Sequence, residues 1–382
     1  MDPLPAASLR AHFADLPDPR SGPALRHDLL DVVTIAVLAV LCGADSWVDV
    51  ELFGTSKAGW LRSFLALPHG IPSHDTFGRV FAALDPAALE RGVLGWVPAL
   101  AATAPPATGR PGVAIDGKTL RRSHDRAHGK GPLHLVSAWA AANGVVLGQL
   151  AVADKSNEIT AIPALLEVLA VAGCVVTVDA MGCQREIART IRARGADYAL
   201  ALKANHPQLA ADVAGIVADA LGPNAGGYTV GYHETLEKGH GRVERRRCWT
   251  IAEPRVVAWL DPGGAWADLR TIAVVEGTRR IGGETEAERR TYLSSLDGDA
   301  ARFLATVRTH WAIENRLHWV LDLAFREDDS RVRAGHAAEN LAVLRHIALN
   351  LLRRETTAKV GVPTKRLMAG WDDAYLVAVL GQ

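Results

Sequence analysis

The stretch CVVTVD at residues 174–179 is a run of β-branched residues that ends in an acid, and it predicts a fully buried strand. Before it, residues 158–172 have the amphipathic pattern of a helix. After it, residues 184–194 predict a second helix, closed by Gly195, and residues 197–203 predict another apolar strand. Strands that alternate with helices in this way predict a sheet covered by helices.

The same alternation extends toward the N-terminus. GVAID at 112–116 predicts a short strand that also ends in an acid. Residues 133–142 and 145–152 predict two strands that flank Asn143-Gly144, the strongest short signal for a β-hairpin. We therefore expect an α/β fold whose mixed sheet has flanking helices.

Residues 1–100 have a helical pattern. One apolar run follows Asp28, a favourable N-cap, and stops at Gly43. The expected helices span 29–42, 47–65 and 73–84, and a fourth starts at 85–86. Residues 101–111, AATAPPATGRP, lack periodicity and predict a linker, which places a domain boundary there.

Residues 206–297 are less regular than the segments around them. A helix is expected at 206–221, and glycine-rich breaks separate the strand-like pieces that follow. Those pieces lie at 227–234, 243–251, 270–277 and 290–296. We interpret the whole segment as a β-rich insertion. A strongly periodic helix is expected at 301–325, and further helices at 338–354.

Composition excludes several classes of protein. The 382 residues are 49% hydrophobic, which excludes a disordered or collagen-like chain, and only four are cysteines, without a C-x-x-C pair. The longest apolar run, 32–42, is about half of the roughly 20 residues that a membrane-spanning helix needs. The N-terminus does not resemble a signal peptide. We expect a soluble cytoplasmic protein that has no membrane partner.

Two acids, Asp116 and Asp179, are expected at the ends of buried strands, where ligands of open α/β sheets gather. A buried carboxylate is costly unless it is paired or binds a cation. The two acids could share a metal ion, or each could cap the turn that follows its strand. The residues alone leave both explanations open.

A third candidate acid lies in HWAIENRLHWVLD at 310–322. His310, Glu314, His318 and Asp322 are four residues apart and form one stripe on the expected helix. The stripe could bind zinc, although the H-E-x-x-H spacing is absent. It could also be a buried hydrogen-bonded network, or Glu314 could complete a carboxylate triad. Three carboxylates suit Mg²⁺, and two ions about 3.5–4 Å apart would support phosphoryl transfer.

The net charge is zero, from 42 Lys and Arg against 42 Asp and Glu, which by itself argues against a nucleic-acid protein. The distribution of charged residues along the chain, however, favours binding to nucleic acid. EKGHGRVERRR at 237–247 and the segments 116–131 and 331–366 are each locally basic. Three basic clusters near or downstream of candidate catalytic acids favour a track for a phosphate backbone.

These stretches resemble the insertion-sequence DDE transposases of bacteria, in the subgroup that includes the H-repeat-associated proteins. The resemblance is carried by AIDGKTLR at 114–121, DKSNEITAIP at 154–163, VTVDAMGCQ at 176–184, YALALKANH at 198–206, EKGHGR at 237–242, HWAIENRLHWVLD at 310–322 and AAENLAVLRHIALNLL at 337–352. SHDTFGRVFAALDP at 73–86 is similar to the helical region that accompanies this catalytic domain.

The resemblance implies a ribonuclease H-like catalytic domain at 101–382, with the β-rich insertion at about 206–297, and a helical transposase-associated domain at 1–100. Its catalytic and metal-binding acids would be Asp116, Asp179 and Glu314, with Asp322 and Glu327 as weaker rivals for the third place. They would hold two Mg²⁺ ions, for which Mn²⁺ can substitute.

The implied function is a DNA transposase that cleaves and joins strands at the ends of its element. Its partners would be double-stranded DNA, both terminal inverted repeats and target DNA, and further copies of this chain. The protein would be nucleoid-associated when bound. Two alternatives are a catalytically silent DNA-binding relic or regulator of the same family, and a stand-alone nuclease.

One departure concerns the phosphate-gripping residues. Relatives carry Tyr, Arg, Glu and Lys at positions that here hold Val307, His310, Glu314 and Leu321, so only the Glu is retained. Other residues must then contact DNA. Those expected to do so are Lys118, Arg121, Arg122, Lys203, His240, Arg242, Arg245, Arg308, His310, Arg316, Arg331 and Arg333.

Overall fold

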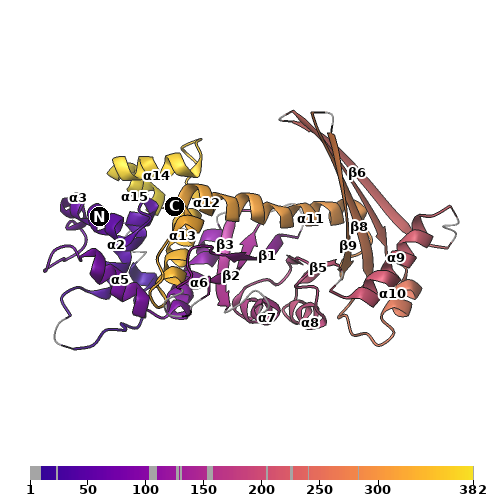
Figure 1. The fold of residues 1–382 in the computed structure, drawn as a ribbon, viewed down its shortest axis with the longest axis horizontal. Coiled ribbons are helices and arrows are strands. Elements are labelled where there is room, and N and C mark those ends of the chain that lie inside the picture. Colours follow the sequence, from indigo (N-terminus) through magenta and orange to yellow (C-terminus); the bar gives the residue numbers. More distant parts are fainter. Residues whose placement is uncertain are drawn as a thin grey trace.

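The computed structural model describes residues 10–22, 25–102, 110–125, 129, 131–152, 158–203, 205–223, 227–239, 241–282 and 284–381. Figure 1 shows an elongated molecule with the N-terminal helices at one end and the long strands of the insertion at the other. The first half comprises α2 (Leu29–Leu41), α3 (Trp47–Ser56), α4 (Ala58–Leu61), α5 (His74–Ala83), α6 (Pro86–Ala102), β1 (Gly112–Thr119), β2 (His134–Ala140), β3 (Val145–Val152), α7 (Glu158–Val168), β4 (Val175–Val178), α8 (Arg185–Ala193) and β5 (Asp197–Leu202). The second half comprises α9 (Pro207–Leu221), β6 (Val230–Gly239), β7 (Arg242–Ile251), α10 (Pro254–Leu260), β8 (Thr271–Ile281), β9 (Glu284–Ser294), α11 (Ala300–Ile313), η3 (Glu314–His318), α12 (Trp319–Phe325), η4 (Glu327–Asp329), α13 (Ala337–Arg354), α14 (Val362–Trp371) and α15 (Asp373–Leu380).

The strands form one nine-stranded mixed sheet in the order β3-β2-β1-β4-β5-β9-β8-β7-β6. The hairpin β2–β3 and the pair β1–β2 are antiparallel, whereas β1, β4 and β5 run parallel. The predicted mixed α/β architecture is therefore confirmed. The insertion continues the same sheet, because β9 pairs antiparallel with β5.

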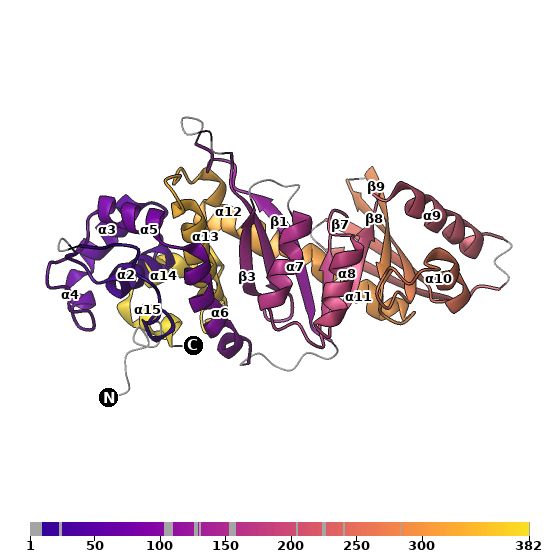
Figure 2. The same ribbon diagram turned by 90° about the horizontal axis from the view of Figure 1, so that it is seen from below.

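The two faces of the central sheet are covered by different helices. Val113 and Ile115 of β1 belong to the core shared with α7 and α8, whereas Ala114 belongs to the core on the opposite face. Figure 2 shows α7 and α8 in front of the sheet and α11 behind it. Because side chains alternate along a strand, Asp116 and Lys118 point to the side of α11 and α12.

Some predicted bounds were wrong. We expected a strand that ends at Asp116, but β1 continues to Thr119, because β2 pairs with it as far as Thr119 and His134. The predicted helix 47–65 is broken at Lys57 into α3 and α4. The insertion strands are longer than expected, with 11 residues in each of β8 and β9. Helices α14 and α15 lie beyond the last predicted helix.

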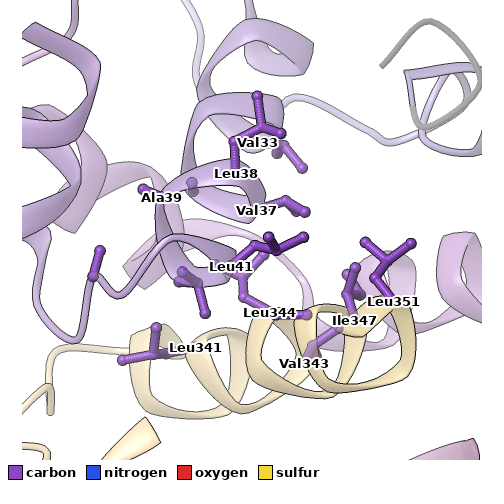
Figure 3. Packing of buried hydrophobic residues seen from close by; sticks show 14 of the residues in the cluster. Val33, Val37, Leu38, Ala39, Leu41, Leu341, Val343, Leu344, Ile347 and Leu351 are labelled. Atoms are coloured by element: carbon purple, nitrogen blue, oxygen red, sulfur yellow. The ribbon is translucent and has the colours of Figure 1, made fainter. Parts of the chain in front are cut away.

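The N-terminal helices share a hydrophobic core with the C-terminal ones. Figure 3 shows Val37 and Leu41 of α2 close to Leu344 and Ile347 of α13. The buried guanidinium of Arg366, on α14, donates hydrogen bonds of 3.1 and 2.7 Å to the last turn of α2 at the Val40 carbonyl. Among the described helices, none has both the length and the apolarity to cross a membrane.

Candidate active site

Sheet register brings Asp116 and Asp179 side by side. The parallel pairing of β1 with β4 ends at Ile115 and Val178, and each acid is the next residue along the chain, Asp179 directly after β4. Beyond that point β1 keeps only its antiparallel partner β2, so Asp116 lies inside β1 but at the end of the parallel ladder.

The predicted helix at 301–325 is interrupted at the candidate acid. The helix α11 ends at Ile313, a π-helical turn covers Glu314–His318, and α12 follows. The helix α11 comes close to β1: a Cβ at Gly112 would lie 2.7 Å from Oγ1 of Thr309 and would force that side chain to shift. Single π-helical turns inside α-helices occur frequently at functional sites. Here the turn lies over Asp116.

Three side chains meet at this turn. Ligand atoms of Asp116, Glu314 and His318 all lie within 4.8 Å of one another. Oδ2 of Asp116 is 3.3 Å from Nε2 of His318. Asp116 is half-buried, Glu314 is exposed and His318 is buried. Asp179 is outside this group of three, which is the one such group found among the described residues.

Electrostatic interaction with Asp116 shows that Asp179 belongs to the same site. Burial raises the pKa of Asp179, and the charge of Asp116 raises it further. Burial alone would also raise the pKa of Asp116, but the contact with the imidazole of His318 holds it below its usual value. Burial lowers the pKa of His310, whose Nδ1 lies 3.1 Å from Oγ1 of Thr177 on β4. His310 is therefore neutral at neutral pH.

Asp179 also has the capping role that the sequence left open. Its Oδ1 accepts backbone N–H groups from Met181 at 3.1 Å and Gly182 at 3.3 Å. These bonds hold the loop after β4 in place. The two explanations for this acid, capping and ligand binding, are compatible, since only one carboxylate oxygen is used.

The site opens into a cleft of 670 Å³. One wall carries Asp116, His310 and Glu314, and the opposite wall is formed by the insertion strands β7–β9. The arginines in the lining are Arg245, Arg246, Arg279 and Arg290. The guanidinium of Arg290 stacks over the ring of Trp311 on α11, 5.2 Å from its centroid. The cleft thus places Asp116 and Glu314 opposite a wall of mixed charge, since the same strands also contribute Glu244, Glu286 and Glu288.

Comparison with known proteins assigns the family. Residues 107–351 match the family model described as "Transposase DDE domain", and residues 10–97 match the model of the region associated with that domain. The chain belongs to the DDE transposase family. It is a transposase by this membership, and therefore a nucleic-acid-processing enzyme.

Relatives of this DDE transposase align along nearly its whole length. The H repeat-associated protein YhhI of Escherichia coli K12, whose name proposes a transposase, is 35% identical over 97% of each chain. YncI of Escherichia coli O157:H7, whose name also proposes a transposase, is 38% identical over 98% of this chain and 94% of its own. A solved piggyBac transposase chain, from a synaptic complex with hairpin DNA, aligns with 99% of this chain and 77% of its own, at 10% identity and a TM-score of 0.38.

One residue expected to contact DNA is engaged inside the transposase. The Lys118 side chain is only 12% exposed, and its Nζ pairs with Asp322 at 2.5 Å and Glu327 at 2.9 Å. Two carboxylates therefore hold this ammonium in the absence of DNA, and the expected contact of Lys118 with DNA stays a prediction. The same pairs occupy Asp322 and Glu327, the two rivals of Glu314, whereas Glu314 faces the cleft.

The other expected DNA contacts are dispersed. Arg242, Arg245 and Arg308 pair with glutamates of the insertion, at 2.8, 2.8 and 2.6 Å. Arg121 and Arg122 pair with acids of η4, and Nε of Arg333 donates to the Arg122 carbonyl. Lys203, Arg316 and Arg331 are exposed. His240 lies outside the described residues. Of the expected set, the structure brings Arg245 and His310 to the cleft.

Two further features of this transposase escaped sequence reasoning. His318 was visible in the stripe at 310–322 but received no role there. Glu158, the first residue of α7, is buried and lies 2.5 Å from Nε2 of His134. A Cβ at Gly117 would lie 2.3 Å from its carboxylate, so the glycine next to Asp116 makes room for this pair. The available signal was the acid in DKSNEITAIP at 154–163.

Proposed function

We propose that this transposase cleaves DNA at the ends of its insertion sequence and joins the freed strands to target DNA. Asp116, Asp179 and Glu314 would hold two Mg²⁺ ions, for which Mn²⁺ can substitute. The proposal rests chiefly on one observation, the meeting of Asp116 and Glu314 at one wall of a cleft whose opposite wall carries four arginines among its charged residues.

The residues present fit a divalent metal ion. Carboxylate oxygens are the ligands that Mg²⁺ prefers, and three candidate ligand atoms lie within 4.8 Å of one another. When bound, such ions polarise the phosphodiester and activate the attacking water or 3′-hydroxyl. Both groups come from outside the protein, so no nucleophilic side chain is required.

The arginines of the opposite wall would bind the DNA backbone. Guanidinium groups recognise phosphates through paired N–H donors, and Arg245, Arg279 and Arg290 present them to the cleft. Neutral His310, held by Thr177, would contribute hydrogen bonding without adding charge next to Asp116. The arginines of that wall would therefore position the phosphate, and the carboxylates of the opposite wall would hold the ions.

Further parts of the proposal concern architecture and partners. The order β1, β2, β3, α7, β4, α8, β5 supports a ribonuclease H-like catalytic core. We assign residues 101–382 to the catalytic domain and residues 1–100 to a helical region that recognises terminal inverted repeats or assembles the complex. The active form would be a homo-oligomer on double-stranded DNA, in the bacterial cytoplasm at the nucleoid.

The test is a cleavage and joining assay on duplex DNA that carries the sequences flanking the gene. With Mg²⁺ we expect nicks at the element ends and joined products, and none with EDTA. Asp116→Asn, Asp179→Asn and Glu314→Gln should each abolish cleavage but retain DNA binding. Asp219→Asn, an exposed acid of α9, is the matched control.

The assay also separates the alternatives. A silent DNA-binding relic or regulator would bind the ends without nicking them, and a stand-alone nuclease would nick without joining. Near-normal cleavage by Asp179→Asn would remove that acid from the catalytic set.

A further inference from the structure

His318 is buried next to the carboxylates of the site, and its ring nitrogens are incompletely satisfied. The residue is 4% exposed; Nε2 lies 3.3 Å from Oδ2 of Asp116 without the geometry of a hydrogen bond, and Nδ1 has no hydrogen-bond partner in the part of the chain that the structure describes. Buried polar atoms are nearly always hydrogen-bonded, so an exception requires an explanation. A ligand that completes the site is one such explanation.

The position of His318 follows from the π-helical turn. Glu314 opens that turn and His318 closes it, so both lie on the side that faces β1. Asp116 reaches the same point from β1, since strand alternation points it toward the helix. Two secondary-structure elements thus hold three donor atoms together without a loop. Such rigid support is what a preorganised ligand set requires.

The spacing suits ligands of one ion. Two donors that bind an ion at about 2.1 Å and at a right angle lie roughly 3 Å apart. Nε2 of His318 is 3.3 Å from Oδ2 of Asp116, and the whole group of three lies within 4.8 Å. The Asp116–His318 pair is therefore close to the spacing of two ligands of one ion.

We propose that His318 is a ligand, through Nε2, of the same divalent ion that Asp116 and Glu314 hold. The inference builds on the proposed metal-dependent function. It makes one of the two ion positions a mixed nitrogen and oxygen site. Imidazole favours transition metals over Mg²⁺, so this position should prefer Mn²⁺ or Co²⁺ to a greater degree than carboxylates alone would.

A purely structural role makes a different prediction. In that role, His318 would only orient Asp116 by charge or hydrogen bonding. Gln could then replace His318, because the amide N–H of Gln has a similar reach. As a metal ligand, His318 cannot be replaced by an amide nitrogen. The imidazole in the cleft lining is that of His310, whose Nδ1 contacts Thr177.

The test is pulsed electron paramagnetic resonance of Mn²⁺ bound to the full-length protein. A coordinated imidazole nitrogen modulates the electron spin echo, so the wild type should show ¹⁴N modulation. His318→Gln should lose that modulation and bind Mn²⁺ at least about tenfold more weakly. His310→Gln should retain the modulation, and so should His233→Gln, a histidine of β6 outside the cleft lining.

Each outcome decides between the two proposals. Bound Mn²⁺ without ¹⁴N modulation, or modulation that survives in His318→Gln, would overturn the role of His318 and leave the metal-dependent function standing. Absence of any bound Mn²⁺ would overturn both. In the cleavage assay, His318→Gln should also lower the ratio of the rate in Mn²⁺ to the rate in Mg²⁺, whereas a structural defect would lower both rates alike.

Discussion

Nζ of Lys118 lies 2.9 Å from Oε2 of Glu327, a carboxylate whose side chain is 1% exposed. Burial alone would raise the pKa of Glu327, but the charges of Lys118 and Arg345 hold it below its usual value. Lys118 is two residues beyond Asp116, and Glu327 follows α12. The pair therefore fastens β1 to the end of the helix that carries Glu314 and His318.

We expect Lys118→Met to destabilise the protein strongly, because it leaves Glu327 buried without its nearest cation. Breaking a buried ion pair costs about 3–5 kcal/mol, which should appear as a lower free energy of unfolding in urea. Glu327→Gln in the same chain should recover part of that loss. The exposed pair Arg189–Glu186 is the control, where Arg189→Met should cost less than about 1 kcal/mol. Equal losses at both pairs would contradict the tertiary role of Lys118.

Stability should depend on pH through Glu90. Burial raises the pKa of this α6 carboxyl to about 8, and the backbone N–H of Gln149 on β3 donates to it at 2.9 Å. The carboxyl is protonated in the folded protein at neutral pH but ionised in the unfolded chain. Its contribution to stability is thus full below pH 4.5 and is lost as the pH rises toward 8.

Glu90→Gln should remove this pH dependence, since an amide accepts the same hydrogen bond without ionising. The variant should be more stable than the wild type at pH 8, and the difference should vanish near pH 4. Thermal unfolding at a series of pH values measures it. A constant difference across that range would show that Glu90 does not titrate as expected.

The shared helical core can be tested at Asn340 of α13. Its fully buried side chain donates to the carbonyls of Phe81 at 2.8 Å and Leu84 at 2.9 Å, at the end of α5. Asn340→Leu leaves both carbonyls unsatisfied and should cost about 2–4 kcal/mol in the free energy of unfolding. Gln208→Leu, on the exposed side of α9, should cost little.

The shared core also determines how deletion of the N-terminal helices should be interpreted. Because α2 and α5 pack on α13, removal of residues 1–100 would expose the core face of α13. The role of the N-terminal region in DNA recognition is better tested by exposed substitutions in the full chain than by deletion. A single unfolding transition that Asn340→Leu shifts as a whole would support this view.

The arginines of the cleft predict a salt dependence of DNA binding. If Arg279 contacts a phosphate, Arg279→Gln should reduce the slope of log K against log salt by about 0.9, with little change in sequence preference. Arg290→Gln should act similarly and also lose its stacking on Trp311. Arg189→Gln, on α8 and outside the cleft lining, is the control. Unchanged slopes for both cleft variants would place the DNA elsewhere.

Local sequence patterns were sufficient to predict much of the fold of this protein. The β-branched run at 174–179, the Asn143-Gly144 turn and the periodic helices predicted the α/β class with a mixed sheet. Motifs within single segments also carried the family resemblance, which the comparisons confirmed. The choice of Asp116, Asp179 and Glu314 stays a prediction until the variants are measured.

The sequence by itself determined the elements and the acids, because strand and helix periodicity and short motifs are local properties of the chain. Only the tertiary structure decided which partners those residues meet. Lys118 was expected to contact DNA from its place in a basic cluster, and packing pairs it with Glu327, 209 positions away. His318 looked like one member of a stripe, and the π-helical turn brings it to Asp116. Burial and pairing depend on packing between distant segments, which no local pattern encodes.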